Sequence, residues 1–212
     1  QMHADLAPYA SGVASQVTVF ANTNAINCFL PEDLGDFLRD HPQVRVSLEE
    51  QPSPAIVQAV AAGQVDIGVV AAESGPGSLE TRPYRQDRLV LVVPASHALA
   101  RQPAASFADV LGEPFVCLHA GSAIHTFMMN HAARLGGRLD VRIQVRSFNA
   151  VCRMVAAGVG IGMVPTGSKD PYALRRAALG VLRILIEKQL DLDLAEAIEF
   201  AIGQFADQVK AE

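Results

Sequence analysis

Polar and aromatic side chains recur just after the strands that this sequence predicts, where they could bind a small molecule. They are Asn22, Thr23, Asn24, Ser53, Glu73, His119, Ser122, Phe148, Asn149 and Thr166. In open α/β sheets, ligands sit outside the carboxyl ends of the strands, and helix N-termini there present free N–H groups that favour anions. Capping or turn formation explains most of these residues when each is taken singly. If they converge on a cleft between two lobes, they form the predicted ligand site.

The sequence contains no recognised nucleotide-binding or catalytic motif. Gly158-x-Gly160 lacks the third glycine of a dinucleotide-binding loop, because residue 163 is Met. It also lies between a helix and a strand, which is the reverse of the required order. We interpret these two glycines as a helix C-cap and a point of close packing. With no Walker A sequence and no GxSxG elbow, we predict that the chain is not an enzyme, although catalytic groups distant in sequence stay an alternative.

Histidine and cysteine spacing predicts neither a metal site nor a cofactor. His119, His125 and His131 recur every six residues, which places them on different faces of any helix. The three cysteines are isolated and form no CxxC pair. Buried free thiols are typical of a reducing compartment, so we predict a cytoplasmic protein.

The composition is that of a compact globular protein. Half of the 212 residues are hydrophobic and 18% are charged. The net charge is -5, and no Lys/Arg run or basic stripe indicates a nucleic-acid surface. Every apolar run is short and broken by Gly, Pro or charge, so we expect no membrane insertion.

The element that organises the chain is the stretch VAAGQVDIGVV at residues 60–70. It predicts a helix, a glycine C-cap at Gly63 and a buried strand, with Asp66 bracing the start of that strand. A near-repeat, VAAGVGIGMVP, follows at 155–165. Two such units indicate an α/β fold of two Rossmann-like lobes joined by two crossing hinge strands, with the ligand cleft between the lobes.

The rest of the chain fits this two-lobe plan. Alternating or β-rich runs predict strands at 16–21, 44–50, 66–70, 89–94, 114–119, 141–145 and 161–165, with helices between them. Short strand–helix–strand connections predict parallel pairing. Because the strands at 89–94 and 161–165 both end in Val-Pro, we interpret them as the connections between lobes. The prediction assigns 13–94 plus 166–212 to lobe I and 95–165 to lobe II, with 1–12 as the remnant of a linker helix.

In the order of its motifs, the sequence resembles the effector-binding domain of LysR-type transcriptional regulators, which has the type 2 periplasmic-binding-protein fold. The resemblance covers about residues 16–170. It rests on four segments: Phe29-Leu30-Pro31 followed by Leu34, Phe37 and His41-Pro42; Val60 to Gly68; Leu89 to Pro94 with His97 and Leu99 after it; and Val155 to Pro165.

The resemblance implies a sensor of a small-molecule effector, often an organic anion, held between two lobes. It implies a homodimer or homotetramer, and control of transcription through a DNA-binding domain that would precede Gln1. A free-standing solute-binding protein of a transporter is the alternative on the same fold. After Pro165 the sequence departs from the family pattern: a helix is predicted after 166, one strand at 181–186 and an amphipathic helix at 190–212.

Overall fold

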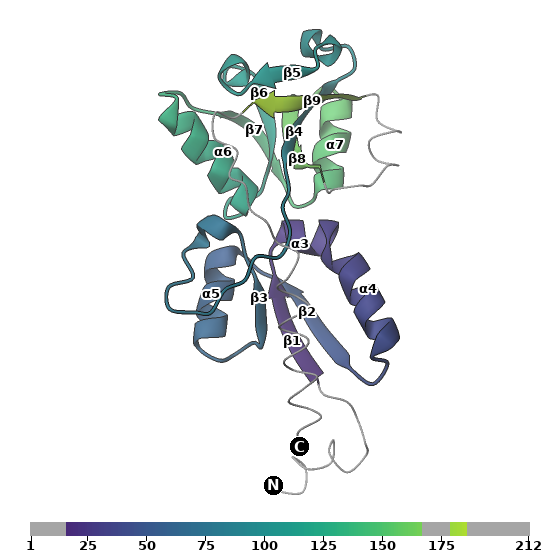
Figure 1. Cartoon of the computed structure of the whole chain (residues 1–212). Coiled ribbons are helices and arrows are strands. Elements are labelled where there is room, and N and C mark those ends of the chain that lie inside the picture. Colours follow the sequence, from purple (N-terminus) through teal and green to yellow (C-terminus); the bar gives the residue numbers. More distant parts are fainter. Residues whose placement is uncertain (1–15, 167–178, 186–212) are drawn as a thin grey trace, which may run out of the picture. The chain divides into compact units, whose positions relative to one another are not determined.

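The computed structural model describes residues 16–166 and 179–185 (Figure 1). Contacts divide the chain into two units, with the boundary after Arg85. The described residues of the first unit are 16–85, and those of the second are 86–166 and 179–185. None of the helices among these residues has the length and apolar character needed to span a membrane.

The first unit contains a three-stranded sheet in the order β2-β1-β3. Its strands are β1 (Gln16–Ala21), β2 (Arg45–Glu50) and β3 (Ile67–Val69), and its helices are α3 (Thr23–Cys28), α4 (Leu30–Asp40), α5 (Ser53–Ala61) and the 3-10 turn η1 (Ala72–Ser74). β1 pairs in parallel with both β2 and β3. The parallel pairing predicted from the short connections is therefore confirmed.

Alternation along β1 sets the core of this unit. Val17, Val19 and Ala21 are buried on one face of the strand. The helix α5 packs on β3 through Gly68, where an added Cβ would lie 2.6 Å from the Ile56 Cγ2 atom. A glycine at this position lets the helix approach the strand closely.

Asp66 braces the start of the strand, as the sequence predicts. Its Oδ2 atom accepts a hydrogen bond of 2.7 Å from the Thr18 backbone N–H. Gly63, which ends the preceding helix, has φ of 66°, a conformation that favours glycine. The segment Gly63–Asp66 therefore has a structural role at the amino end of β3.

The second unit contains a mixed six-stranded sheet in the order β5-β9-β4-β8-β6-β7. The strands are β4 (Leu89–Pro94), β5 (Ala104–Ser106), β6 (Pro114–Leu118), β7 (Asp140–Val145), β8 (Ile161–Pro165) and β9 (Leu179–Leu185). The helices are α6 (Ala123–Arg134) and α7 (Phe148–Ala156), with 3-10 turns η2 (Ala98–Arg101) and η3 (Ala108–Val110). β6 runs parallel to β7 and β8, whereas β4 is antiparallel to β8 and β9.

The two longer helices of this unit cover opposite faces of the sheet (Figure 1). On one face, alternate strand residues such as Leu91, Phe115 and Met163 form a core with Met128 of α6. On the other face, a Cβ added at Gly162 would lie 2.6 Å from the Cγ1 atom of Val151 in α7. Because side chains alternate across a strand, the apolar residues of β4, β6 and β8 pack against α6 on one face and against α7 on the other.

Gly158 and Gly160 have the structural roles predicted for them. Gly158 ends α7 with φ of 78°. A Cβ added at Gly160 would lie 2.1 Å from the Pro114 carbonyl oxygen, so only glycine fits at this close approach to the start of β6.

The strand pairing differs from the predicted connection between lobes. Leu89 pairs with Pro165, whereas Pro94 pairs with Leu179 of β9. Because β4 and β8 are antiparallel, their two terminal prolines lie at opposite ends of the strands. β4 therefore belongs wholly to the second unit, while the predicted boundary placed it in lobe I.

The C-terminal predictions are tested only at β9. The strand expected at 181–186 is present at Leu179–Leu185 and pairs with β4 and β5. The expected helices after 166 and at 190–212, and the linker remnant at 1–12, lie outside the described residues.

Candidate functional site

In the first unit, the carboxyl ends of three parallel strands meet at one edge of the sheet. Backbone hydrogen bonds fix their relative positions: Asn22 N–H donates to the Val69 carbonyl and Gln51 N–H to the Ala21 carbonyl, each at 3.0 Å. The Ser53 hydroxyl oxygen accepts a 3.1 Å hydrogen bond from the Ala71 N–H. The edge therefore brings together Asn22, Thr23 and Ser53, as predicted from the ends of the strands.

Most of the polar side chains at this edge already have structural partners. Asn22 caps α3 by accepting a hydrogen bond of 3.0 Å from the Ala25 N–H. Thr23 is buried, and its hydroxyl donates a 2.7 Å hydrogen bond to Glu50 Oε1. The Thr23 oxygen can still accept a hydrogen bond, and the exposed Glu50 carboxylate adds a negative charge beside it.

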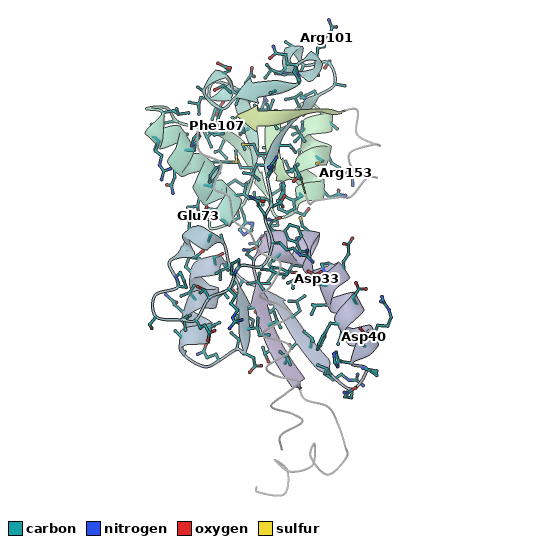
Figure 2. The ribbon with its side chains drawn as sticks, in the orientation of Figure 1. Asp33, Asp40, Glu73, Arg101, Phe107 and Arg153 are labelled. Atoms are coloured by element: carbon teal, nitrogen blue, oxygen red, sulfur yellow. The ribbon has the colours of Figure 1, made fainter. Side chains whose placement is uncertain are left out.

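Three further polar residues lie near this edge of the first unit: Asn24, Glu73 and Glu50. Asn24 lies in α3 and is partly buried, whereas Glu73 lies in η1 and is exposed (Figure 2). The residues predicted from the sequence do not include Glu50, which ends β2. Counting the last residue of the strand at 44–50, rather than only the residues after it, would have found it.

In the second unit, the corresponding edge is formed by the carboxyl ends of β6, β7 and β8. The His119 N–H donates a 2.8 Å hydrogen bond to the Val145 carbonyl, which joins the ends of β6 and β7. The predicted residues His119, Ser122, Phe148, Asn149 and Thr166 all follow strands that end at this edge.

The N-termini of two helices lie at this edge and carry serine caps. Ser122 Oγ accepts a 3.1 Å hydrogen bond from the His125 N–H, and Ser147 Oγ accepts one of 3.2 Å from the Ala150 N–H. The first turn of each helix has no acidic residue. Phe148 is 5% exposed and packs in the core, whereas Asn149 is exposed. Asn149 is thus the better placed of the two for contact with a ligand.

Two of the three histidines in the six-residue repeat lie close enough to interact. His119 precedes α6 rather than belonging to it. Only His125 and His131 therefore lie on different faces of one helix, as the spacing predicts. His125 Nε2 lies 3.1 Å from Gln144 Nε2 of β7. Burial, with the nearby His119, lowers the pKa of His125. His119 Nδ1 is buried and has no hydrogen-bond partner among the described residues.

Thr166 joins the end of β8 to the segment before β4. Its N–H donates a 2.7 Å hydrogen bond to the Arg88 carbonyl, and its hydroxyl donates one of 2.8 Å to Asp87 Oδ1. These bonds connect the residue after β8 to the residues just before β4. The Thr166 hydroxyl therefore has a structural partner, although the residue is exposed.

The described residues contain no group of three or more His, Cys, Asp or Glu side chains that could hold a metal ion. Cys117 and Cys152 are buried and Cys28 is partly buried, and none of the three is in a disulfide. Burial raises the pKa of Cys117 to about 11. This thiol is therefore protonated at neutral pH and a poor nucleophile.

The chain, which has this α/β fold and polar residues at the carboxyl ends of its strands, matches a family of known proteins. Residues 10–184 match the model of the LysR substrate binding domain. The chain belongs to this family. Its members are the effector-binding domains of LysR-type regulators, which favours a sensor domain over the alternative of a transporter's solute-binding protein.

Solved structures with the same fold come from regulators of this family. The chain has a TM-score of 0.72 and 18% identity to the effector-binding domain of QuiR in complex with shikimate, covering 91% of this chain and 95% of that one. It has the same TM-score and 22% identity to the regulatory domain of CcmR from Synechocystis in complex with 2-PG, covering 92% and 96%. These similarities confirm the predicted fold class, the type 2 periplasmic-binding-protein fold.

A second similarity is to a protein with a different name and function. The chain is 50% identical over 101 residues to the glycine–tRNA ligase beta subunit of Stutzerimonas stutzeri, and equally so to that of Pseudomonas entomophila. The matched stretch is 48% of this chain, and it spans only 13% of the length of each ligase subunit.

Proposed function

We propose that this domain binds a small-molecule effector through the residues at the carboxyl ends of its strands. The observation that carries the proposal is the shared edge in each unit, where polar groups from separate loops are held together by backbone hydrogen bonds. The binding residues are those predicted from the sequence, with Glu50, His125 and Gln144 added. Asn22, Ser53, Ser122 and Phe148 chiefly position the others, because their side chains already cap helices, hold loops or pack in the core.

An effector regulates such a domain only by binding one conformation more tightly than another. The chain passes from one unit to the next after Arg85, and the segment that follows is hydrogen-bonded to Thr166. A ligand at the second edge would act directly on this segment. We propose that binding there changes the conformational equilibrium read by a DNA-binding domain outside this chain.

Calorimetry on matched variants tests the location of the site. A thermal-shift screen of small carboxylates, phosphate esters and polyols first identifies a ligand, since binding to the native state raises apparent stability. Thr23→Ala in the first unit and Asn149→Ala in the second should then each weaken affinity about tenfold, the effect of one lost hydrogen bond. Asn130→Ala, an exposed asparagine later in α6, should leave affinity unchanged. Unchanged affinity in both test variants would contradict this location.

The assembly and compartment of the protein are also proposals. Family resemblance supports a homodimer or homotetramer, and the isolated buried thiols support a cytoplasmic location. Light scattering across a concentration series tests the first, with a single mass equal to one chain as the contrary result. Fractionation of cells tests the second.

The ligase similarity supports a second candidate function, a contribution to glycyl-tRNA synthesis. The chain spans 13% of the ligase beta subunit, and its family is regulatory rather than catalytic. This candidate therefore ranks below effector binding. The assay is charging of tRNA with radiolabelled glycine in the presence of ATP, with the complete ligase as the positive control. Charging by the chain alone would favour the second candidate.

A further inference from the structure

We propose that the chain connecting the two units bends at Gln86 and is held by a carboxylate on either side of this residue. The boundary between the units lies directly before Gln86. Asp33 holds the preceding residues on the first unit, and Asp87 holds the following ones within the second. This inference goes beyond effector binding, because it concerns where the protein changes conformation whether or not a ligand is bound.

The anchor on the first unit is a carboxylate with two donors. Asp33, in the first turn of α4, accepts one hydrogen bond from the Tyr84 hydroxyl and one of 2.7 Å from the Arg85 guanidinium. The Arg85 side chain is 44% exposed, and an exposed ion pair alone would hold the chain weakly. The buried Tyr84 ring strengthens the anchor, because it packs edge to face on Phe29, the N-cap residue of the same helix. The chain is therefore fixed to α4 as far as Arg85.

The anchor in the second unit extends the pairing of β4 with β8. Leu89 pairs with Pro165 at the end of this ladder. The Thr166 N–H continues the ladder with a 2.7 Å hydrogen bond to the Arg88 carbonyl. Asp87 Oδ1 accepts two further hydrogen bonds, one of 2.8 Å from the Thr166 hydroxyl and one of 2.7 Å from the Arg88 N–H. The chain is therefore tied to the sheet of the second unit from Asp87 onward.

A single residue separates the two anchors. Relative rotation of two domains is absorbed by a few backbone dihedral angles in the connection between them. The fixed residues on either side leave such a rotation to the φ and ψ angles of Gln86, with the adjoining ψ of Arg85 and φ of Asp87. A hinge this short gives few alternative conformations, and regulation by a ligand requires that one of them be selected.

Distances between two spin labels, one on each unit, test the proposal without any ligand. The label sites are Asp40→Cys at the end of α4 and Arg101→Cys in η2, both exposed, in a Cys28→Ser background (Figure 2). Glycine populates positive φ about as readily as negative φ, so Gln86→Gly should widen the distance distribution about twofold. Gln102→Gly, the same substitution at the exposed residue after η2, is the matched control and should leave the distribution unchanged.

A second variant tests the anchor that follows the hinge. Thr166→Val removes the hydroxyl that binds Asp87 but keeps the N–H that binds Arg88. The hinge should then lengthen and the distance distribution should widen, because one of the bonds that hold Asp87 is lost.

An unchanged distribution in Gln86→Gly, or equal widening in Gln102→Gly, would overturn the hinge at Gln86. No widening in Thr166→Val would overturn the anchor at Asp87. Because these measurements contain no effector, either failure would leave the effector-binding proposal to its own calorimetric test.

Discussion

The Tyr84 hydroxyl donates a 2.5 Å hydrogen bond to Asp33 Oδ2, which fixes the segment just before the unit boundary onto α4. The other Asp33 oxygen accepts a 2.7 Å hydrogen bond from Arg85. The Tyr84 ring is 6% exposed and meets Phe29 edge to face. One carboxylate therefore holds both of the residues that directly precede the unit boundary after Arg85.

Tyr84→Phe should lower the free energy of unfolding by about 1–2 kcal/mol. The substitution keeps the ring contact with Phe29 but leaves Asp33 without one of its donors. Urea denaturation measures the loss. Arg82→Ala is the matched control, because Arg82 and Glu80 form a surface ion pair of little energetic value. An equal loss in the two variants would contradict this role for Tyr84.

The same tyrosine predicts sensitivity to alkaline pH. Burial, followed by the hydrogen bond to Asp33, raises the pKa of Tyr84 well above its ordinary value of 10.0. The native state therefore holds the proton more tightly than the unfolded chain. Its contribution to stability is full below pH 10.0 and declines as the pH rises above it. The wild type should lose stability more steeply than Tyr84→Phe between neutral and strongly alkaline pH, as measured by urea denaturation. Equal slopes of stability against pH in the two proteins would contradict this role of Tyr84.

Two glycine variants should have opposite effects on stability. Gly160→Ala places a Cβ 2.1 Å from the Pro114 carbonyl oxygen, so backbone must move and we expect a loss of about 3 kcal/mol. Gly35→Ala in α4 meets nothing within 4 Å and should stabilise by about 0.5–1 kcal/mol. Thermal unfolding of the two variants checks the pair. A tolerated Gly160→Ala would contradict the close approach of Gly160 to Pro114 at the start of the β6–β8 pair.

Thiol labelling should distinguish the three cysteines. Cys28 is partly buried, while Cys117 and Cys152 are buried. Raising the pKa of Cys117 from 9.0 to about 11 lowers its thiolate fraction about a hundredfold at neutral pH. Mass spectrometry after brief alkylation of the native protein should find label at Cys28 first, and all three labelled in denaturant. Early labelling of Cys117 would contradict its burial.

Local patterns were enough to predict much of the fold. The alternation in QVTVFA predicted β1 at its observed bounds, and LVLVVP did the same for β4. Ser147 was predicted as a cap, and its oxygen accepts from Ala150 N–H. Each of these features depends on residues within a few positions of each other, where propensity and periodicity are informative.

Non-local pairing was beyond such reasoning. The matched Val-Pro endings predicted that the chain passes between the lobes at both Pro94 and Pro165, but antiparallel pairing places these residues at opposite ends of β4 and β8. The nearness of His119 to His125 depends on a loop between β6 and α6, which a fixed six-residue spacing does not describe. Gln144 lies within β7, so no rule based on residues after strands could have selected it.

Hydrogen exchange with and without an effector found by the screen tests whether the effector binds at the carboxyl ends of the strands. Binding there should add protection in Asn22–Asn24, His119–His125 and Phe148–Asn149. The amino ends of the strands, represented by Gly63–Asp66 and Gly136–Asp140, should be unchanged. Protection confined to those amino ends would contradict effector binding at the carboxyl edges.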